Sequence, residues 1–102
     1  MRRGEVWLAE VGEKRRPVLV LTRSEVLDVR QLVTVAEITR SIRGLAVEVD
    51  IDHSQSGLDR PSVINCVGIH TIAQASLSGR VGHVPEDVMG RVCSAVSYAF
   101  GC

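Results

Sequence analysis

The chain has 102 residues, of which 45% are hydrophobic and 24% are charged, and 12 basic side chains balance 12 acidic ones. This length supports a single domain over residues 1–102, and the composition excludes a disordered polar tail. The zero net charge excludes a protein that attracts nucleic acid by bulk charge, so a positive site would have to be local. Without a CxxC pair, a signal-peptide pattern or a long apolar run, the sequence predicts a cytoplasmic protein that does not enter a membrane.

Strands are predicted over most of the first two thirds of the chain. Residues 5–11 and 17–23 are rich in Val and Leu, and the GEKRR segment between them is typical of a connecting loop. We therefore expect two neighbouring antiparallel strands. A third strand is predicted at 31–39, and the alternation of apolar and polar residues at 45–51 indicates a strand with one solvated face.

The rest of the chain changes its pattern twice. Residues 52–60 are loop formers, and the apolar pattern that resumes at 61–72 predicts a central strand. Apolar residues then recur at steps of three and four between Pro85 and Gly101, which suit the start and the end of one amphipathic helix. The predicted fold is mainly β, a small, curved, partly closed antiparallel sheet with a C-terminal helix packed on it.

Common catalytic motifs do not occur in this sequence. The histidines at 53, 70 and 83 share no metal-ligand spacing with one another or with a cysteine, so no metal is predicted. No GxxxxGK[ST], GxGxxG or GxSxG pattern is present, which argues against a nucleotide-binding enzyme or a hydrolase with a nucleophile elbow. The remaining candidates for chemistry are cations and hydroxyls.

Two of these candidates lie at the ends of predicted strands. Arg16 precedes Pro17, which restricts it to extended backbone at the lip of a strand, where a guanidinium can bind a phosphate in bidentate fashion. The alternative is a solvated loop cation. Thr39 ends the third strand just before a basic segment, and its alternative is an ordinary β-former with a solvated hydroxyl.

Four segments resemble one known family in their order and spacing. RRGEVWLAEV, RRPVLVLTR, VTVAEIT and PSVINC are similar to the MazF/PemK toxin endoribonucleases, and the similarity extends over nearly the whole chain. The resemblance implies the toxin of a type II toxin-antitoxin pair, with an SH3-like barrel that forms a homodimer and cleaves single-stranded RNA without a metal or other cofactor. It also implies a cognate antitoxin whose acidic, disordered tail covers the cationic cleft.

The same resemblance implies roles for individual residues. The catalytic arginine and threonine of the family fall on Arg16 and Thr39, and the serine that helps to position the phosphate falls on Ser62. The neighbouring cations would draw in the RNA backbone, and these are Lys14, Arg15, Arg40 and Arg43. Many relatives carry an acidic residue, a glutamine and later an arginine where this chain has Val67, Gly68 and His70. We therefore expect a different selection of bases.

The expected reaction is attack of an RNA 2′-hydroxyl on the adjacent phosphorus, which leaves a 2′,3′-cyclic phosphate and a 5′-hydroxyl. A fixed guanidinium at Arg16 can stabilise the charge that develops on the phosphorane. Two candidates for the proton acceptor stay open. They are Glu13, a loop carboxylate near Arg16 in sequence, and His70, which would have to face the cleft to act as an acid or base. Trp7 has two readings, as a stacking platform for bases or as a residue of the core or the dimer interface.

Two other classes of function are compatible with this fold. A toxin of the same architecture can poison DNA gyrase through a C-terminal segment, for which residues 98–101 are the candidate here. An SH3-like adaptor without catalysis is the other alternative. The arginine before the proline and the threonine at the strand end favour RNA cleavage over both.

Overall fold

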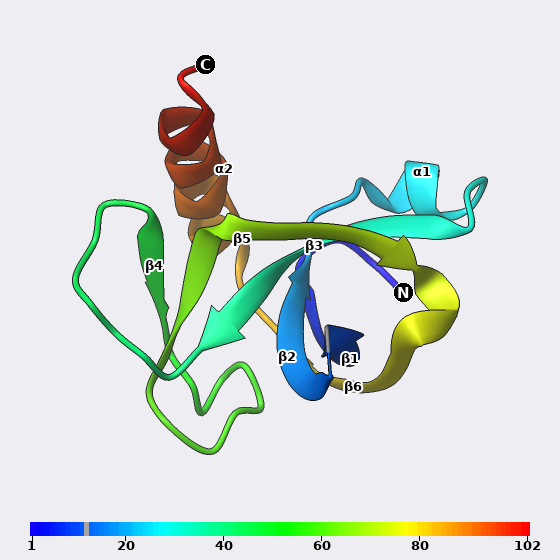
Figure 1. Ribbon diagram of the computed structural model, residues 1–102, viewed down its shortest axis with the longest axis horizontal. Helices are drawn as coiled ribbons and strands as arrows, with labels where there is room; N and C mark the ends of the chain where they lie inside the picture. The colour runs from blue at the N-terminus through cyan, green and yellow to red at the C-terminus, as the bar shows by residue number, and fades with distance from the viewer. Residues whose placement is uncertain (12) are drawn as a thin grey trace.

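The computed structural model describes residues 1–11 and 13–102, and it shows one antiparallel sheet with a long helix at the C-terminus (Figure 1). The sheet has six strands in the order β4-β5-β3-β2-β1-β6. These strands are β1 (Glu5–Val11), β2 (Lys14–Val20), β3 (Leu32–Thr39), β4 (Glu48–Ile51), β5 (Ser62–Ala73) and β6 (Leu77–His83). The helices are α1 (Ser24–Leu27), the 3-10 turn η1 (Gln74–Ser76) and α2 (Glu86–Phe100).

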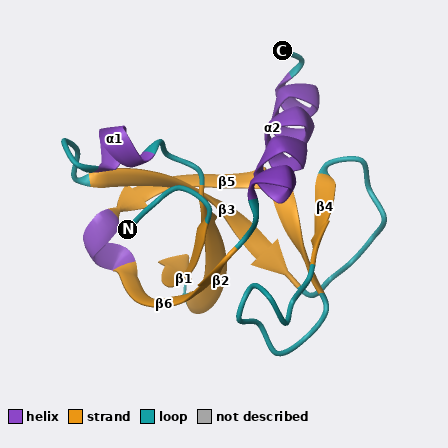
Figure 2. Cartoon of the chain, turned by 180° about the vertical axis from the view of Figure 1, so that it is seen from behind, coloured by secondary structure: helices purple, strands orange, loops and turns teal. Residues whose placement is uncertain are grey.

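The sheet curves so that its two faces bury separate clusters of apolar side chains. Along β3, Ala36 and Ile38 point into the cluster covered by α2, whereas Val33 and Val35 point into a second cluster with Leu27 and Leu77. This is the period-two alternation expected of a strand that is covered on both sides. The curvature is visible in Figure 2, where α2 rises beside β4 and β5. The prediction of a mainly β chain with a curved antiparallel sheet is confirmed.

Helix α2 closes the cluster on its side of the sheet. Its buried residues recur at helical spacing, and they are Val88, Met89, Val92 and Ala95. Pro85 precedes the first turn, and Gly101 ends the helix with a φ of 74° in the left-handed region. The amides of Gly101 and Cys102 donate to the carbonyls of Tyr98 and Ser97, which is a Schellman motif. The predicted start and end of this helix are confirmed, and no helix among the described residues could cross a bilayer.

Predictions about strands were wrong in several places. Residues 21–23 and 45–47 were predicted as strand but lie after the end of β2 and before the start of β4. Lys14 to Arg16 belong to β2 and not to a loop, because they pair with β1 and place Arg15 opposite Glu10. Of the predicted loop, Gly12 lies outside the described residues. Strand β6 was not predicted, because the segment LSGRVGH has two glycines and few apolar residues. It forms on the otherwise free edge of β1, in a register with two irregularities.

Candidate active site

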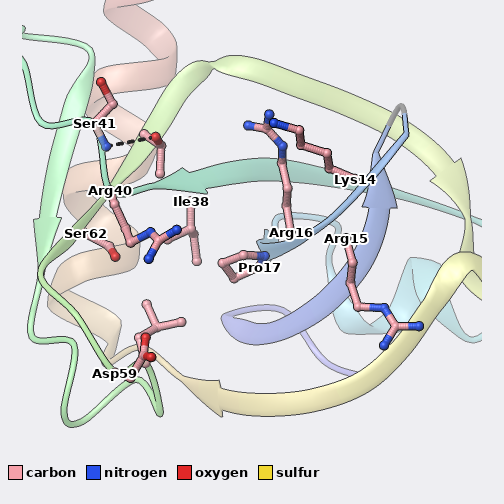
Figure 3. Close-up of a pocket in the computed structure, with 11 residues that line it drawn as sticks. Lys14, Arg15, Arg16, Pro17, Ile38, Arg40, Ser41, Asp59 and Ser62 are labelled. Atoms are coloured by element: carbon pink, nitrogen blue, oxygen red, sulfur yellow. Dashed lines mark hydrogen bonds between the residues drawn. The ribbon is translucent and has the colours of Figure 1, made fainter.

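A pocket of about 380 Å³ opens between the start of β2 and the end of β3 (Figure 3). Its walls come from segments that are far apart in sequence, and the lining residues are Lys14, Arg15, Arg16, Pro17, Ile38, Thr39, Arg40, Ser41, Leu58, Asp59 and Ser62. The structure therefore brings the predicted arginine, threonine and serine into one pocket with three of the four predicted RNA-binding cations. Asp59 contributes the negative charge among these lining residues.

Strand β2 sets the direction of the cations. Side chains alternate along a strand, so Lys14 and Arg16 share one face and Arg15 lies on the other. Figure 3 shows Lys14 and Arg16 reaching in the same direction, while Arg15 points away from them. Arg16 pairs with Ala9 of β1, so its backbone is fixed within the sheet. Its side chain is 40% exposed, which leaves the guanidinium accessible from the pocket.

The two predicted hydroxyls come from strands that are paired with each other. Thr39 pairs with Val63, and Ser62 stands next to that residue. Oγ1 of Thr39 accepts a hydrogen bond of 3.1 Å from the amide of Ser41, so its own proton is free to be donated to a ligand. Oγ of Ser62 donates to the carbonyl of Arg60 at 3.1 Å and would have to rotate to donate to a phosphate.

A smaller hollow of about 160 Å³ adjoins this pocket and contains a residue that was not predicted from the sequence. It shares Arg16, Thr39 and Ser41 with the pocket and adds Glu37, Arg43 and Asn65. Nη1 of Arg16 donates to Oε1 of Glu37 at 3.3 Å. One feature of the sequence could have identified Glu37 as a site residue. It is the only charged residue in the β3 segment LVTVAEIT, and it shares a strand face with Thr39.

Three predicted site residues do not line the larger pocket, and these are Glu13, His70 and Arg43. Glu13 is exposed in the turn before β2 and is not among the described residues that line either hollow. His70 lies in β5, where its Nε2 is 3.1 Å from Oε2 of Glu37. Arg43 lines the smaller hollow while its Nε lies 3.4 Å from Oε2 of Glu48. His70 is thus connected to Arg16 through one carboxylate.

The family model described as "PemK-like, MazF-like toxin of type II toxin-antitoxin system" matches residues 2–100. The chain belongs to the PemK/MazF toxin family. The resemblance seen in the four sequence segments is confirmed.

Individual members of the family are similar to this chain over most of their length. "Probable endoribonuclease MazF5" of Mycobacterium tuberculosis is 36% identical over 101 residues, which cover 98% of this chain and 93% of the relative. "Endoribonuclease MazF3" of the same species is 40% identical over 88 residues, or 86% and 84% of the two chains. The solved structure of "Mycobacterium tuberculosis toxin MazF-mt6" aligns with a TM-score of 0.89 at 37% identity, covering 95% of this chain and 96% of that one.

Two acidic side chains of this PemK/MazF toxin have a pKa below the usual value. Burial alone would raise the pKa of Glu48, but hydrogen bonds from the amides of Arg43 and Leu45 and from the Arg43 guanidinium lower it overall. Glu5 behaves similarly, because the indole of Trp7 and the cation of Arg80 hold its pKa below the usual value despite burial. Both carboxylates are therefore charged at neutral pH.

Trp7 and Cys66 have structural surroundings in this toxin. Trp7 packs against the second apolar cluster and donates to Oε1 of Glu5 at 3.2 Å, as expected of a core residue. Burial raises the pKa of the Cys66 thiol to about 11, so it stays protonated at neutral pH. Among the residues that the structure describes, no three His, Cys, Asp or Glu side chains lie close enough to hold a metal ion.

Proposed function

We propose that this chain is the toxin of a type II toxin-antitoxin pair and that it cleaves single-stranded RNA in the pocket that contains Arg16, Thr39 and Ser62. One observation carries the proposal. Residues from β2, β3 and β5 meet in a pocket with Lys14 and Arg40, on a protein whose net charge is zero. Family membership and two relatives named endoribonucleases agree with this activity.

The proposed reaction is a transesterification within the RNA. The 2′-oxygen attacks the adjacent phosphorus as its proton passes to a base, the bond from phosphorus to the 5′-oxygen breaks, and that oxygen takes up a proton. Arg16 would stabilise the charge on the nonbridging oxygens, an effect of about 3–4 kcal/mol for one well-placed donor. Thr39 would donate a second hydrogen bond to the same oxygens. No step in this reaction requires a metal ion.

The proton acceptor is assigned less directly. Glu13 stands in the exposed turn before β2, three residues before Arg16. His70 contacts Glu37, which in turn contacts Arg16, so it belongs to the same group of charges. We propose that one of these two side chains accepts the proton. Neither is among the described residues that line the two hollows, so the 2′-hydroxyl of a bound RNA has to reach beyond them.

The proposal extends to the fold and to the assembly. We infer that the curved sheet is an SH3-like barrel forming a single domain, and that the protein is a homodimer in the cytoplasm. The far end of α2 exposes Tyr98 and Phe100 at 70% and 61%, and an apolar groove that includes Val92 and Val96 runs beside them. A surface of this kind supports association with a second copy. Light scattering of wild type and Phe100→Asp tests it, because the variant should be monomeric.

The partner in the proposed pair is an antitoxin with an acidic, disordered tail. Such a tail would satisfy the cations that line the pocket and would exclude RNA by occupying the same place. Deleting the tail from the cognate partner should therefore abolish neutralisation of the toxin. If the truncated partner still neutralised the toxin, this mode of inhibition would be wrong.

The first experiment incubates purified protein with a mixed single-stranded RNA in EDTA and identifies the new ends. Site-specific cuts that carry 2′,3′-cyclic phosphate are expected for wild type and for the control Arg23→Ala, which changes an exposed arginine outside the pocket. Arg16→Ala and Thr39→Ala should fold and lose the cuts. A folded wild type that cuts no RNA would contradict the proposal and would favour the gyrase-directed reading of the exposed C-terminal aromatic residues.

A further inference from the structure

Glu37 is a charged residue in a strand that is otherwise apolar or hydroxylated, and its side chain is only 20% exposed. We propose that Glu37 is a positioning residue that holds the guanidinium of Arg16 in the orientation needed at the phosphate. In this arrangement the other oxygen of the carboxylate faces Nε2 of His70, and Gly68 provides the space that the carboxylate occupies. The inference rests on the proposed function of the pocket.

The register between β3 and β5 makes room for this carboxylate. Ala36 pairs with Ile69, but the next residue, Glu37, pairs with Asn65, so residues 66–68 have no partners on β3. A bulge of this kind bends a strand and redirects side chains, and bulges are frequent beside active sites. The side chain of Glu37 therefore lies against β5 at the place where the ladder is interrupted.

Gly68 leaves room for the carboxylate of Glu37 because it has no side chain. A Cβ at position 68 would lie 2.6 Å from Oε2 of Glu37 and 3.0 Å from Nδ2 of Asn65. The first distance is shorter than van der Waals contact, so any other residue at this position would displace the carboxylate. Because Oε2 is the end of a flexible side chain, the fold would survive the displacement. The glycine thus controls the position of Glu37 more than it controls stability.

The two oxygens of Glu37 contact side chains from the strands on either side of β3. Oε1 accepts from Nη1 of Arg16 on β2 at 3.3 Å, and Oε2 lies 3.1 Å from Nε2 of His70 on β5. Nε2 of His70 is buried and makes no well-aligned hydrogen bond within the described part of the chain. The charged group that it faces is the carboxylate of Glu37. The carboxylate therefore fixes Arg16 relative to two neighbouring strands.

This arrangement predicts a specific effect on the reaction. A guanidinium has five N–H donors, so the contact with Glu37 leaves others free for phosphate oxygens. Holding it in place before the RNA binds lowers the reorganisation needed when charge develops on the phosphorane. The carboxylate also repels the phosphate in the ground state. Glu37 should therefore increase kcat without improving the binding of RNA.

Steady-state and single-turnover cleavage of one short RNA tests this prediction. Glu37→Ala and Glu37→Gln should lower kcat by about tenfold or more, while KM stays the same or falls. Glu10→Gln is the matched control, because Glu10 is a strand carboxylate opposite Arg15 on β1 and β2. It should leave both constants unchanged. Thermal unfolding of each variant would show whether the rates refer to folded protein.

Gly68→Ala is the second variant, since it displaces the carboxylate and leaves its chemistry intact. It should reproduce the loss of kcat seen in Glu37→Ala, and the double variant should lose no more than either single variant, because both changes remove one contact. Additive losses would mean that Gly68 acts on the reaction by another route, and the proposed link between the two residues would be wrong.

Arg16→Ala, measured beside these variants, separates the two proposals. If Arg16→Ala is inactive and folded Glu37→Ala has the kcat of wild type or a higher one, the positioning role is wrong and the proposed function stands. If Arg16→Ala keeps full activity, the proposed pocket fails and the positioning role fails with it. Nitrogen NMR of the Arg16 side chain gives a readout without RNA, since Glu37→Ala should increase its mobility and an unchanged signal would contradict the contact.

Discussion

Two arginine–glutamate pairs each have their arginine in the smaller hollow, with distances of 3.3 Å for Arg16–Glu37 and 3.4 Å for Arg43–Glu48. Glu48 also accepts hydrogen bonds from the backbone amides of Arg43 and Leu45, and its side chain is 2% exposed. Glu37 is 20% exposed, and within the described part of the chain its carboxylate faces the side chains of Arg16 and His70 and accepts no hydrogen bond from a backbone amide. Of the two carboxylates, Glu48 organises a loop, whereas Glu37 contacts groups that are themselves candidates for chemistry.

The comparison teaches that distance alone does not separate a structural ion pair from a functional one. An ion pair with a solvent-exposed partner contributes little to stability, and both arginines are partly exposed. The partners of the carboxylate are more informative, because backbone donors fix a chain segment and side-chain donors fix a functional group. The following predictions test this distinction, beginning with the largest expected effect.

Replacing the arginine of each pair should affect cleavage very differently. Arg16→Ala is expected to lower kcat/KM by about 100-fold or more, since one donor at a developing oxyanion has an effect of this size. Arg43→Ala should lower it by less than about tenfold, because its guanidinium is bound to Glu48 at the rim. Initial rates on one RNA measure both. Equal losses would remove the distinction between the pairs.

Thr39 lies beside Arg16 in both hollows, so its hydroxyl tests whether the chemistry is centred there. Thr39→Val keeps the shape of the side chain and removes the donor, and we expect kcat to fall by about tenfold or more. Thr39→Ser keeps the donor and should retain most of the activity. The opposite order would show that the methyl group matters more than the hydroxyl.

The salt dependence of RNA binding should distinguish paired from unpaired cations. Arg40 lines the pocket and has no ion-pair partner among the described residues. Arg40→Ala should therefore reduce the slope of log K against log salt by about 0.7, the value for one phosphate contact on a single strand. Arg43→Ala should reduce it less, since Glu48 already neutralises this arginine. Titration with an RNA that lacks the reactive 2′-hydroxyl measures both slopes.

The smallest effect concerns the pH dependence of stability. Hydrogen bonds in the folded protein lower the pKa of Glu48. The ionised side chain therefore stabilises the fold at pH values above its pKa in the unfolded chain, and this stabilisation is lost as pH falls through the folded pKa. Urea unfolding should show Glu48→Gln less stable than wild type at pH 7, with a difference that shrinks below about pH 4.5. A difference that grew on acidification would contradict the assigned contacts.

Sequence patterns were sufficient for the elements that bury regular apolar faces. The alternation in β3 and β4 and the helical spacing in α2 reflect local burial, and the structure confirms these elements. Strand β6 escaped prediction because its formation depends on the free edge of β1. The start of β2 was misjudged because its charged residues resemble a loop until the pairing partner on β1 is known.

The sequence by itself determined the family, the C-terminal helix and the residue types at the ends of β2 and β3, because these depend on local pattern and on motifs of fixed spacing. Only the tertiary structure decided which charges meet. Glu37 reaches Arg16, 21 residues away, because β2 and β3 are neighbours in the sheet. It reaches His70 because β3 and β5 are also neighbours, with Val35 opposite His70, and because Gly68 leaves room for the carboxylate. Strand order and register are non-local, so local patterns do not contain these contacts.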